Sequence, residues 1–99
     1  MAKFDVHKVN ARIGYVVDCQ SDLNRAFDTR VVVPLVPTVI YRPVDLRLNP
    51  IFRVDGRDYV FAVQALRTVT ASVLGVRITS LAEHDIAITE AIDRLFFGI

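Results

Sequence analysis

The order of the apolar runs constrains the fold of this chain more than any other feature. Runs rich in β-branched and aromatic residues recur between residues 4 and 74, separated by turn-forming residues, which is typical of short β-strands. One stripe with helical spacing follows over residues 81–99. The predicted strands cover residues 4–6, 15–17, 29–35, 51–54, 59–63 and 68–74. Strands followed by a single helix predict a mainly β, α+β fold, in which a small antiparallel barrel or sheet carries a C-terminal helix.

The clearest turn signal is the pair Asp55 and Gly56, which tolerates the positive backbone angles of a two-residue hairpin turn. Alternation before the turn places Phe52 and Val54 on one face and Arg53 on the other. On the return strand the same alternation gathers three side chains on one face: Tyr59, Phe61 and Val63.

Four residues are expected to delimit the other elements. Pro34 confines the strand of residues 29–35 to a sheet edge or a bulge, because proline cannot donate to a strand ladder. Gly75 is expected to end the last strand. Residues 80–83 match a capping box, with Ser80 as the N-cap, so the helix is expected to begin there. Gly98 lies where a helix end favours a left-handed residue.

Length and charge narrow the classes of function. The 99 residues are expected to form one domain, residues 1–99, and 53% of them are hydrophobic, which favours contact with another chain. Twelve Lys and Arg against eleven Asp and Glu give a net charge of +1, too little to indicate direct nucleic-acid binding. The longest apolar run, residues 31–36, is too short to span a membrane. A lone Cys19 and no signal-peptide pattern predict a cytoplasmic protein.

Few residues carry the pattern of a catalytic or metal site. His7 and His84 lie far apart in sequence, and neither has metal-ligand spacing to Cys19, so no metal and no cofactor are expected. Cys19 is read as a small core residue, since no neighbouring base favours a thiolate.

A general acid–base site could enlist Asp18, Asp22, Arg30 and His84, because such groups can hold a phosphate and move a proton. Surface exposure with a few ion pairs is the favoured interpretation of these residues.

The carboxyl-terminal segment is unusually apolar for a chain end, with Leu95, Phe96, Phe97, Gly98 and Ile99 in succession. Phe96 falls on the apolar stripe of the predicted helix, so we expect it to finish the core. Phe97 falls off that stripe, so we expect it to be offered to a partner.

Three segments, in this order and spacing, resemble the CcdB toxin family: residues 17–23, residues 30–35, and Ala91 and Ile92 with residues 96–99. The resemblance is colinear over the whole chain and implies an SH3-like β-barrel of the CcdB, MazF and Kid type. It also implies a homodimer whose C-terminal helices lie near the two-fold axis. Members of the family poison DNA gyrase in plasmid maintenance. Their C-terminal residues, here Phe97, Gly98 and Ile99, enter the dimer cavity of the gyrase A subunit and trap cleaved DNA.

The resemblance implies a second set of contacts, with the disordered arm of a CcdA-like antitoxin. These contacts map to Leu23, Asn24, Asp93, Phe96 and Phe97. The resemblance further implies that the protein contacts nucleic acid only indirectly, through the antitoxin or the gyrase complex, and that it is not an enzyme. Phe97 stands where the family has tryptophan, which weakens a cation–π contact and removes the indole N–H, a loss of about 0.5–2 kcal/mol in target binding.

Two alternatives stay open. Toxins of the MazF and Kid type share the fold and cleave RNA, and Asp18, Arg30 or His84 could serve that chemistry. The tail could also have decayed, leaving a protein that only binds antitoxin or represses its own operon.

Overall fold

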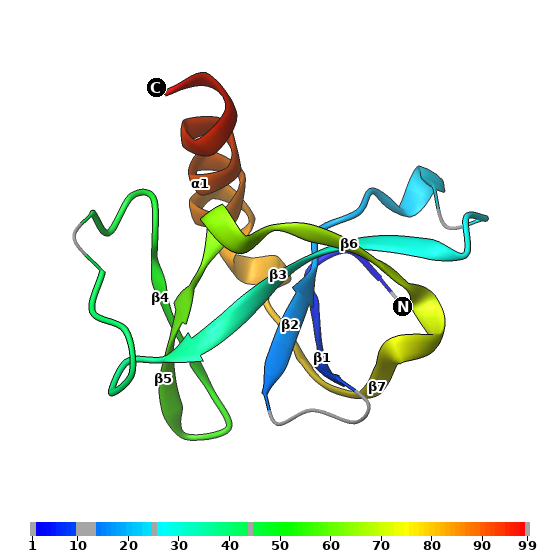
Figure 1. The fold of residues 1–99 in the computed structure, drawn as a ribbon, viewed down its shortest axis with the longest axis horizontal. Helices are drawn as coiled ribbons and strands as arrows, with labels where there is room; N and C mark the ends of the chain where they lie inside the picture. The colour runs from blue at the N-terminus through cyan, green and yellow to red at the C-terminus, as the bar shows by residue number, and fades with distance from the viewer. Residues whose placement is uncertain (1, 10–13, 25, 44, 99) are drawn as a thin grey trace.

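The computed structural model describes residues 2–9, 14–24, 26–43 and 45–98. Strands occupy most of the first 80 residues, and one α-helix follows them (Figure 1). The strands are β1 (Asp5–Val9), β2 (Tyr15–Asp18), β3 (Thr29–Pro37), β4 (Ile51–Val54), β5 (Arg57–Phe61), β6 (Arg67–Thr70) and β7 (Leu74–Ser80). The helices are η1 (Asp22–Asn24), η2 (Val63–Ala65), η3 (Ala71–Val73) and η4 (Ala82–His84), all of 3-10 type, and α1 (Asp85–Phe97). Within these ranges no helix combines the length and apolarity needed to cross a bilayer.

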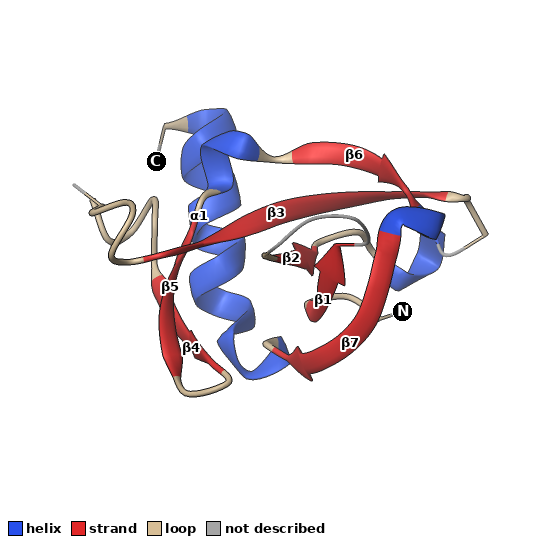
Figure 2. Cartoon of the chain, turned by 60° about the horizontal axis from the view of Figure 1, so that its bottom comes forward, coloured by secondary structure: helices blue, strands red, loops and turns tan. Residues whose placement is uncertain are grey.

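The strands form one curled antiparallel sheet in the order β4-β5-β3-β2-β1-β7, and β6 also pairs with β3. Residues 29–32 of β3 pair with β6, and residues 35–37 pair with β5. Since β2 pairs with residues 32–35, it must lie along the opposite edge of β3. Figure 2 shows α1 running along the sheet, so the prediction of a mainly β fold with one C-terminal helix is confirmed.

The core lies between the sheet and α1. Val6, Val17 and Val33 are aligned across β1, β2 and β3, and therefore share one face of the sheet. All three are fully buried, and α1 contributes Ile88 and Ala91, each at 0% exposure. Burying one such large aliphatic side chain contributes about 1.5–3 kcal/mol, so this seam holds the helix to the sheet.

The predicted hairpin between β4 and β5 is confirmed. Asp55 and Gly56 have φ angles of 52° and 78°, the positive values that a two-residue turn needs. Phe52 and Val54 are buried, whereas Arg53 is exposed and contacts Asp58 across the hairpin at 3.3 Å.

The prediction that Pro34 confines β3 to a sheet edge or a bulge is wrong, because β3 has neighbours along both edges and its pairing with β2 continues through Pro34 without a register shift. The Pro34 carbonyl accepts a hydrogen bond from the Ala62 amide at 3.0 Å. Both backbone polar groups of a strand residue point the same way, so the missing N–H faces this side too. The missing N–H therefore lies at the point where β3 changes partner from β6 to β5. An interior strand tolerates proline at such a point.

The prediction of one strand over residues 68–74 that ends at Gly75 is also wrong, since β6 ends at Thr70, η3 follows, and β7 begins at Leu74 and continues through Gly75. The pairing of β1 with β7 is irregular between Val6 and Val9, and glycine inside a strand commonly accompanies such a bulge. The Gly75 carbonyl lies 3.1 Å from Nδ1 of His7, which places a buried side chain against it.

The helix begins later than the capping-box pattern predicts. Ser80 Oγ accepts a hydrogen bond from the Ala82 amide at 3.1 Å, and η4 intervenes before α1 begins. The buried Leu81 donates its amide to the Phe4 carbonyl at 2.8 Å. Leu81 has φ −105° and ψ 22°, which are not helical angles, so it lies outside α1.

Candidate functional site

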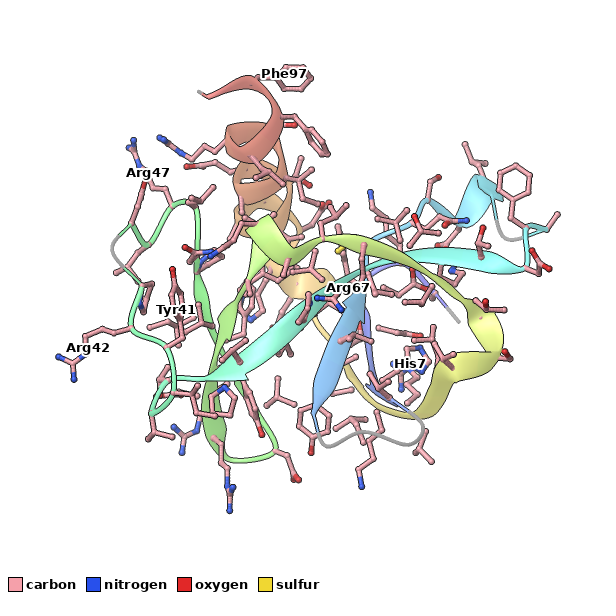
Figure 3. All side chains as sticks on the ribbon, in the orientation of Figure 1. His7, Tyr41, Arg42, Arg47, Arg67 and Phe97 are labelled. Atoms are coloured by element: carbon pink, nitrogen blue, oxygen red, sulfur yellow. The ribbon has the colours of Figure 1, made fainter. Side chains whose placement is uncertain are left out.

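The end of α1 carries an exposed aromatic pair. Phe96 is 61% exposed and Phe97 is 72% exposed, and their ring centroids lie 6.5 Å apart. Figure 3 shows Phe97 projecting from the end of the helix, clear of the sheet. The exposure of Phe97 agrees with its position off the apolar stripe.

The prediction that Phe96 finishes the core is wrong. Ile92 and Leu95 pack against the core from the last turns of α1, whereas Phe96 does not. The reason is one of length, since the end of α1 extends beyond the sheet and has no strand beneath it (Figure 1).

Gly98 ends the helix as predicted. Its φ is 72°, and its amide donates to the Arg94 carbonyl at 2.9 Å. A Cβ added at Gly98 would meet no other part of the described chain within 4 Å, so glycine is favoured here by the backbone angle and not by a lack of space. Ile99, the third residue of the predicted gyrase-binding tail, lies outside the described residues.

The residues assigned to antitoxin binding fall into two groups. Asp93, Phe96 and Phe97 lie on the last turns of α1, and all three are exposed. Leu23, at 94% exposure, and its neighbour Asn24 lie on η1. Both views place η1 on the opposite side of the molecule from the end of α1 (Figures 1 and 2). A single chain therefore does not bring this set of residues together.

The outer face of α1 is acidic and contains one feature that the sequence analysis missed. Asp85, Glu90 and Asp93 line an open hollow together with Ile86, which is 83% exposed. In the sequence, Ile86 lies off the apolar stripe of the helix and beside the acidic Asp85. These two facts could have predicted an exposed apolar contact point.

The candidate acid–base residues are not gathered into one accessible site. Asp18 and Arg30 form a buried ion pair, with Oδ2 at 2.7 Å from Nη2 and at 2.9 Å from Nε. Their side chains are 0% and 1% exposed, so the interpretation of these two residues as surface groups is wrong. The His84 ring lies against Phe52, tilted by 38° with 4.9 Å between ring centroids, and Asp22 accepts the Lys3 amide at 2.9 Å.

Cys19 packs against the core as expected, with Sγ 3.6 Å from the Val17 carbonyl. Burial, and then the negative charge of Asp18, raises the pKa of the Cys19 thiol to about 12. The group therefore stays a protonated thiol near neutral pH and is a poor nucleophile. The described residues contain no cluster of three or more His, Cys, Asp or Glu that could hold a metal ion.

Comparison with known proteins identifies the family. Residues 3–98 match the family model described as CcdB protein. The chain belongs to the CcdB family.

Solved structures of similar fold extend this relationship. The Mycobacterium tuberculosis toxin MazF-mt6 is 18% identical with a TM-score of 0.77, over 93% of this CcdB-family chain and 95% of that chain. An endoribonuclease in complex with its cognate antitoxin, from a mycobacterial species, is 15% identical with a TM-score of 0.78. That match covers 97% of this chain and 94% of the other. At these identities the likeness concerns the fold alone.

Proposed function

We propose that this chain is the toxin of a type II toxin–antitoxin pair, and that it binds the A subunit of DNA gyrase and traps the enzyme on cleaved DNA. The observation that carries the proposal is the aromatic pair at the end of α1, with Phe97 72% exposed. Membership of the CcdB family supports the toxin role. A similar structure is also an endoribonuclease in complex with its cognate antitoxin, which is consistent with an antitoxin partner.

The physical basis of gyrase binding is the burial of Phe97 on the target. Removing one exposed aromatic ring from water contributes about 1.5–3 kcal/mol, and an arginine stacked on the ring adds about 0.5–1 kcal/mol. Gly98 has no side chain, so a partner backbone can approach closely beside the ring. A homodimer would present two such ends to a two-fold symmetric target, which doubles the contact.

The same dimer accounts for the divided antitoxin-binding set. Leu23 and Asn24 on η1 lie away from Asp93, Phe96 and Phe97 within one protomer. A second copy would supply the missing group from its own η1 or α1. A CcdA-like arm that is disordered when free could then follow this surface across both protomers and order as it binds.

We propose a non-catalytic action in the cytoplasm, with no cofactor or metal. RNA cleavage is the alternative, because one similar structure is an endoribonuclease. The geometry of Asp18 and Arg30 disfavours it, since each is buried against the other and neither faces a phosphate in solvent. His84 lies against Phe52 and not in this ion pair.

Purified gyrase provides the test. The protein should inhibit supercoiling and accumulate cleaved DNA complexes. Phe97→Ala should raise the half-inhibitory concentration at least about tenfold, which corresponds to 1.4 kcal/mol of lost binding. Phe27→Ala is the matched control, because Phe27 is 63% exposed but lies in the loop after η1, and it should change inhibition less than about twofold.

Three other results would decide against this proposal. Discrete RNA fragments formed without added metal would support the nuclease alternative. Antitoxin binding without any effect on gyrase would indicate a decayed toxin. Equal inhibition by the Phe97→Ala variant and the unmodified protein would remove the tail from the mechanism.

A further inference from the structure

A groove of about 890 Å³ follows β3 and is separate from the end of α1. Its floor is the stretch of β3 from Val32 to Pro37. Its walls come from the facing parts of β1, β2, β5 and β6, with Val16 and Val69 among the aliphatic side chains that line it. No residue of α1 contributes to it, so it is distinct from the candidate gyrase and antitoxin surface on the helix.

The charge of this groove is of one sign. Lys8, Arg57 and Arg67 line it, and none of the described residues that line it is acidic. Within the described ranges, none of these three cations forms an ion pair, and the Arg67 guanidinium donates only to the Ala65 carbonyl at 3.2 Å. Arg67 (labelled in Figure 3) is exposed and lies on β6 opposite Val32 of β3, so its positive charge is at the rim of the groove.

We propose that this groove binds an extended peptide segment in which carboxylate side chains alternate with apolar ones. An extended strand advances about 3.3 Å per residue, so the β3 stretch of the floor matches roughly six peptide residues. Alternate side chains of such a segment point in opposite directions, which lets apolar groups enter the aliphatic floor while carboxylates reach the three cations at the rim. The proposal concerns the protein alone and does not depend on its action on gyrase.

Single-stranded nucleic acid is the less favoured occupant. Base stacking needs accessible aromatic faces, but Tyr15 and Tyr59 meet edge-to-face at 5.4 Å, and Tyr59 is only 8% exposed. The chain also carries a net charge of only +1, which is small for a protein that must attract a polyanion.

The test begins with an array of eight-residue peptides in which Glu or Asp alternates with Val, Leu or Phe. The tightest binder, labelled with fluorescein, is then titrated with purified protein in 0.1 M salt. An exposed charge pair changes affinity by roughly twofold to fivefold, and reversing a charge adds repulsion, so Arg57→Glu with Arg67→Glu should weaken binding about tenfold or more. Arg42→Glu is the control, because Arg42 is exposed and outside the groove, and it should leave affinity within about twofold.

Methyl spectra of the labelled protein locate the peptide. The valine methyl signals of Val36 and Val69 should shift on titration, and those of Val76, which is 70% exposed on β7, should not. Circular dichroism must show that the charge-reversal variants melt as the unmodified protein does.

The proposal is overturned if no acidic peptide binds, or if lysine in place of glutamate in the peptide leaves binding unchanged. It is also overturned if a twelve-residue oligouridylate shifts the same methyl signals more strongly than any peptide, since the groove would then be a nucleic-acid site. A dimer that dissociates in Arg57→Glu with Arg67→Glu, seen by sedimentation without peptide, would show instead that a second copy covers the groove.

Discussion

Replacing Asp18 with alanine would leave Arg30 as an uncompensated charge in the protein interior. Both side chains are at most 1% exposed, and the closest approach is 2.7 Å between Oδ2 and Nη2. Asp18 Oδ1 also accepts the Gln20 amide at 3.1 Å, so the substitution removes a second buried hydrogen bond. Breaking one partner of a buried pair costs about 3–5 kcal/mol, because the remaining ion keeps its desolvation penalty. In a domain of this size that corresponds to a melting temperature at least about 12 °C lower.

The assay is urea unfolding of four proteins: the unmodified chain, Asp18→Ala, Arg30→Met and the double variant. The double variant leaves no buried charge, so it should lose less stability than either single change. Arg53→Ala is the control, since its pair with Asp58 has side chains 69% and 50% exposed and should contribute at most about 1 kcal/mol. A cost below about 1 kcal/mol for Asp18→Ala, or purely additive single changes, would refute the reasoning.

Further predictions concern four single residues. Burial and the Asp18 charge raise the pKa of Cys19 to about 12. Iodoacetamide should therefore alkylate Cys19 in the native protein at pH 8 at least about tenfold more slowly than in the urea-unfolded chain. Equal alkylation rates would contradict the burial of the thiol. The stabilisation from this neutral thiol should be complete below pH 9 and should decline as the pH rises toward 12, which urea titrations at several pH values would follow. Ile88→Ala, at a fully buried position, should cost about 2–5 kcal/mol of unfolding free energy, and a smaller loss would mean that α1 is loosely packed. Gly98→Val should lower the free energy of unfolding by about 1–2 kcal/mol, because residue 98 has a positive φ. Phe97→Ala should change the melting temperature by less than about 4 °C, because Phe97 is exposed. A much larger fall in melting temperature for Phe97→Ala would show that the tail is part of the core.

Local sequence patterns predicted the elements whose geometry is locally determined. The Asp55 and Gly56 turn needs only two residues with positive φ, and alternation around it was sufficient to place Phe52 and Val54 inside. The elements that differed depend on distant partners. Just before α1, the Leu81 amide donates to the Phe4 carbonyl, 77 positions away in the sequence, and the chain passes through η4 before the helix begins.

The candidate sites show the same division. Helical spacing was enough to predict that Phe97 is exposed, but it could not predict that the helix end carrying Phe96 extends beyond the edge of the sheet. The basic groove was not predicted at all, because Lys8, Arg57 and Arg67 come from three separate strands and share no spacing along the chain. Their proximity depends on the order of strands around β3, which no local pattern determines.

The shared strand β3 also determines how this protein should come apart. Three strands, β2, β5 and β6, pair with the backbone of β3. If β3 separates from the strands in one half of the sheet, its pairing with the other half is therefore lost as well. Amide hydrogens at Val32, opposite Arg67 of β6, and at Val36, opposite Val60 of β5, should therefore show the same free energy of opening in hydrogen–deuterium exchange. The β4 and β5 hairpin and the strand β6, which lie on opposite halves, would then be lost together in a single cooperative transition.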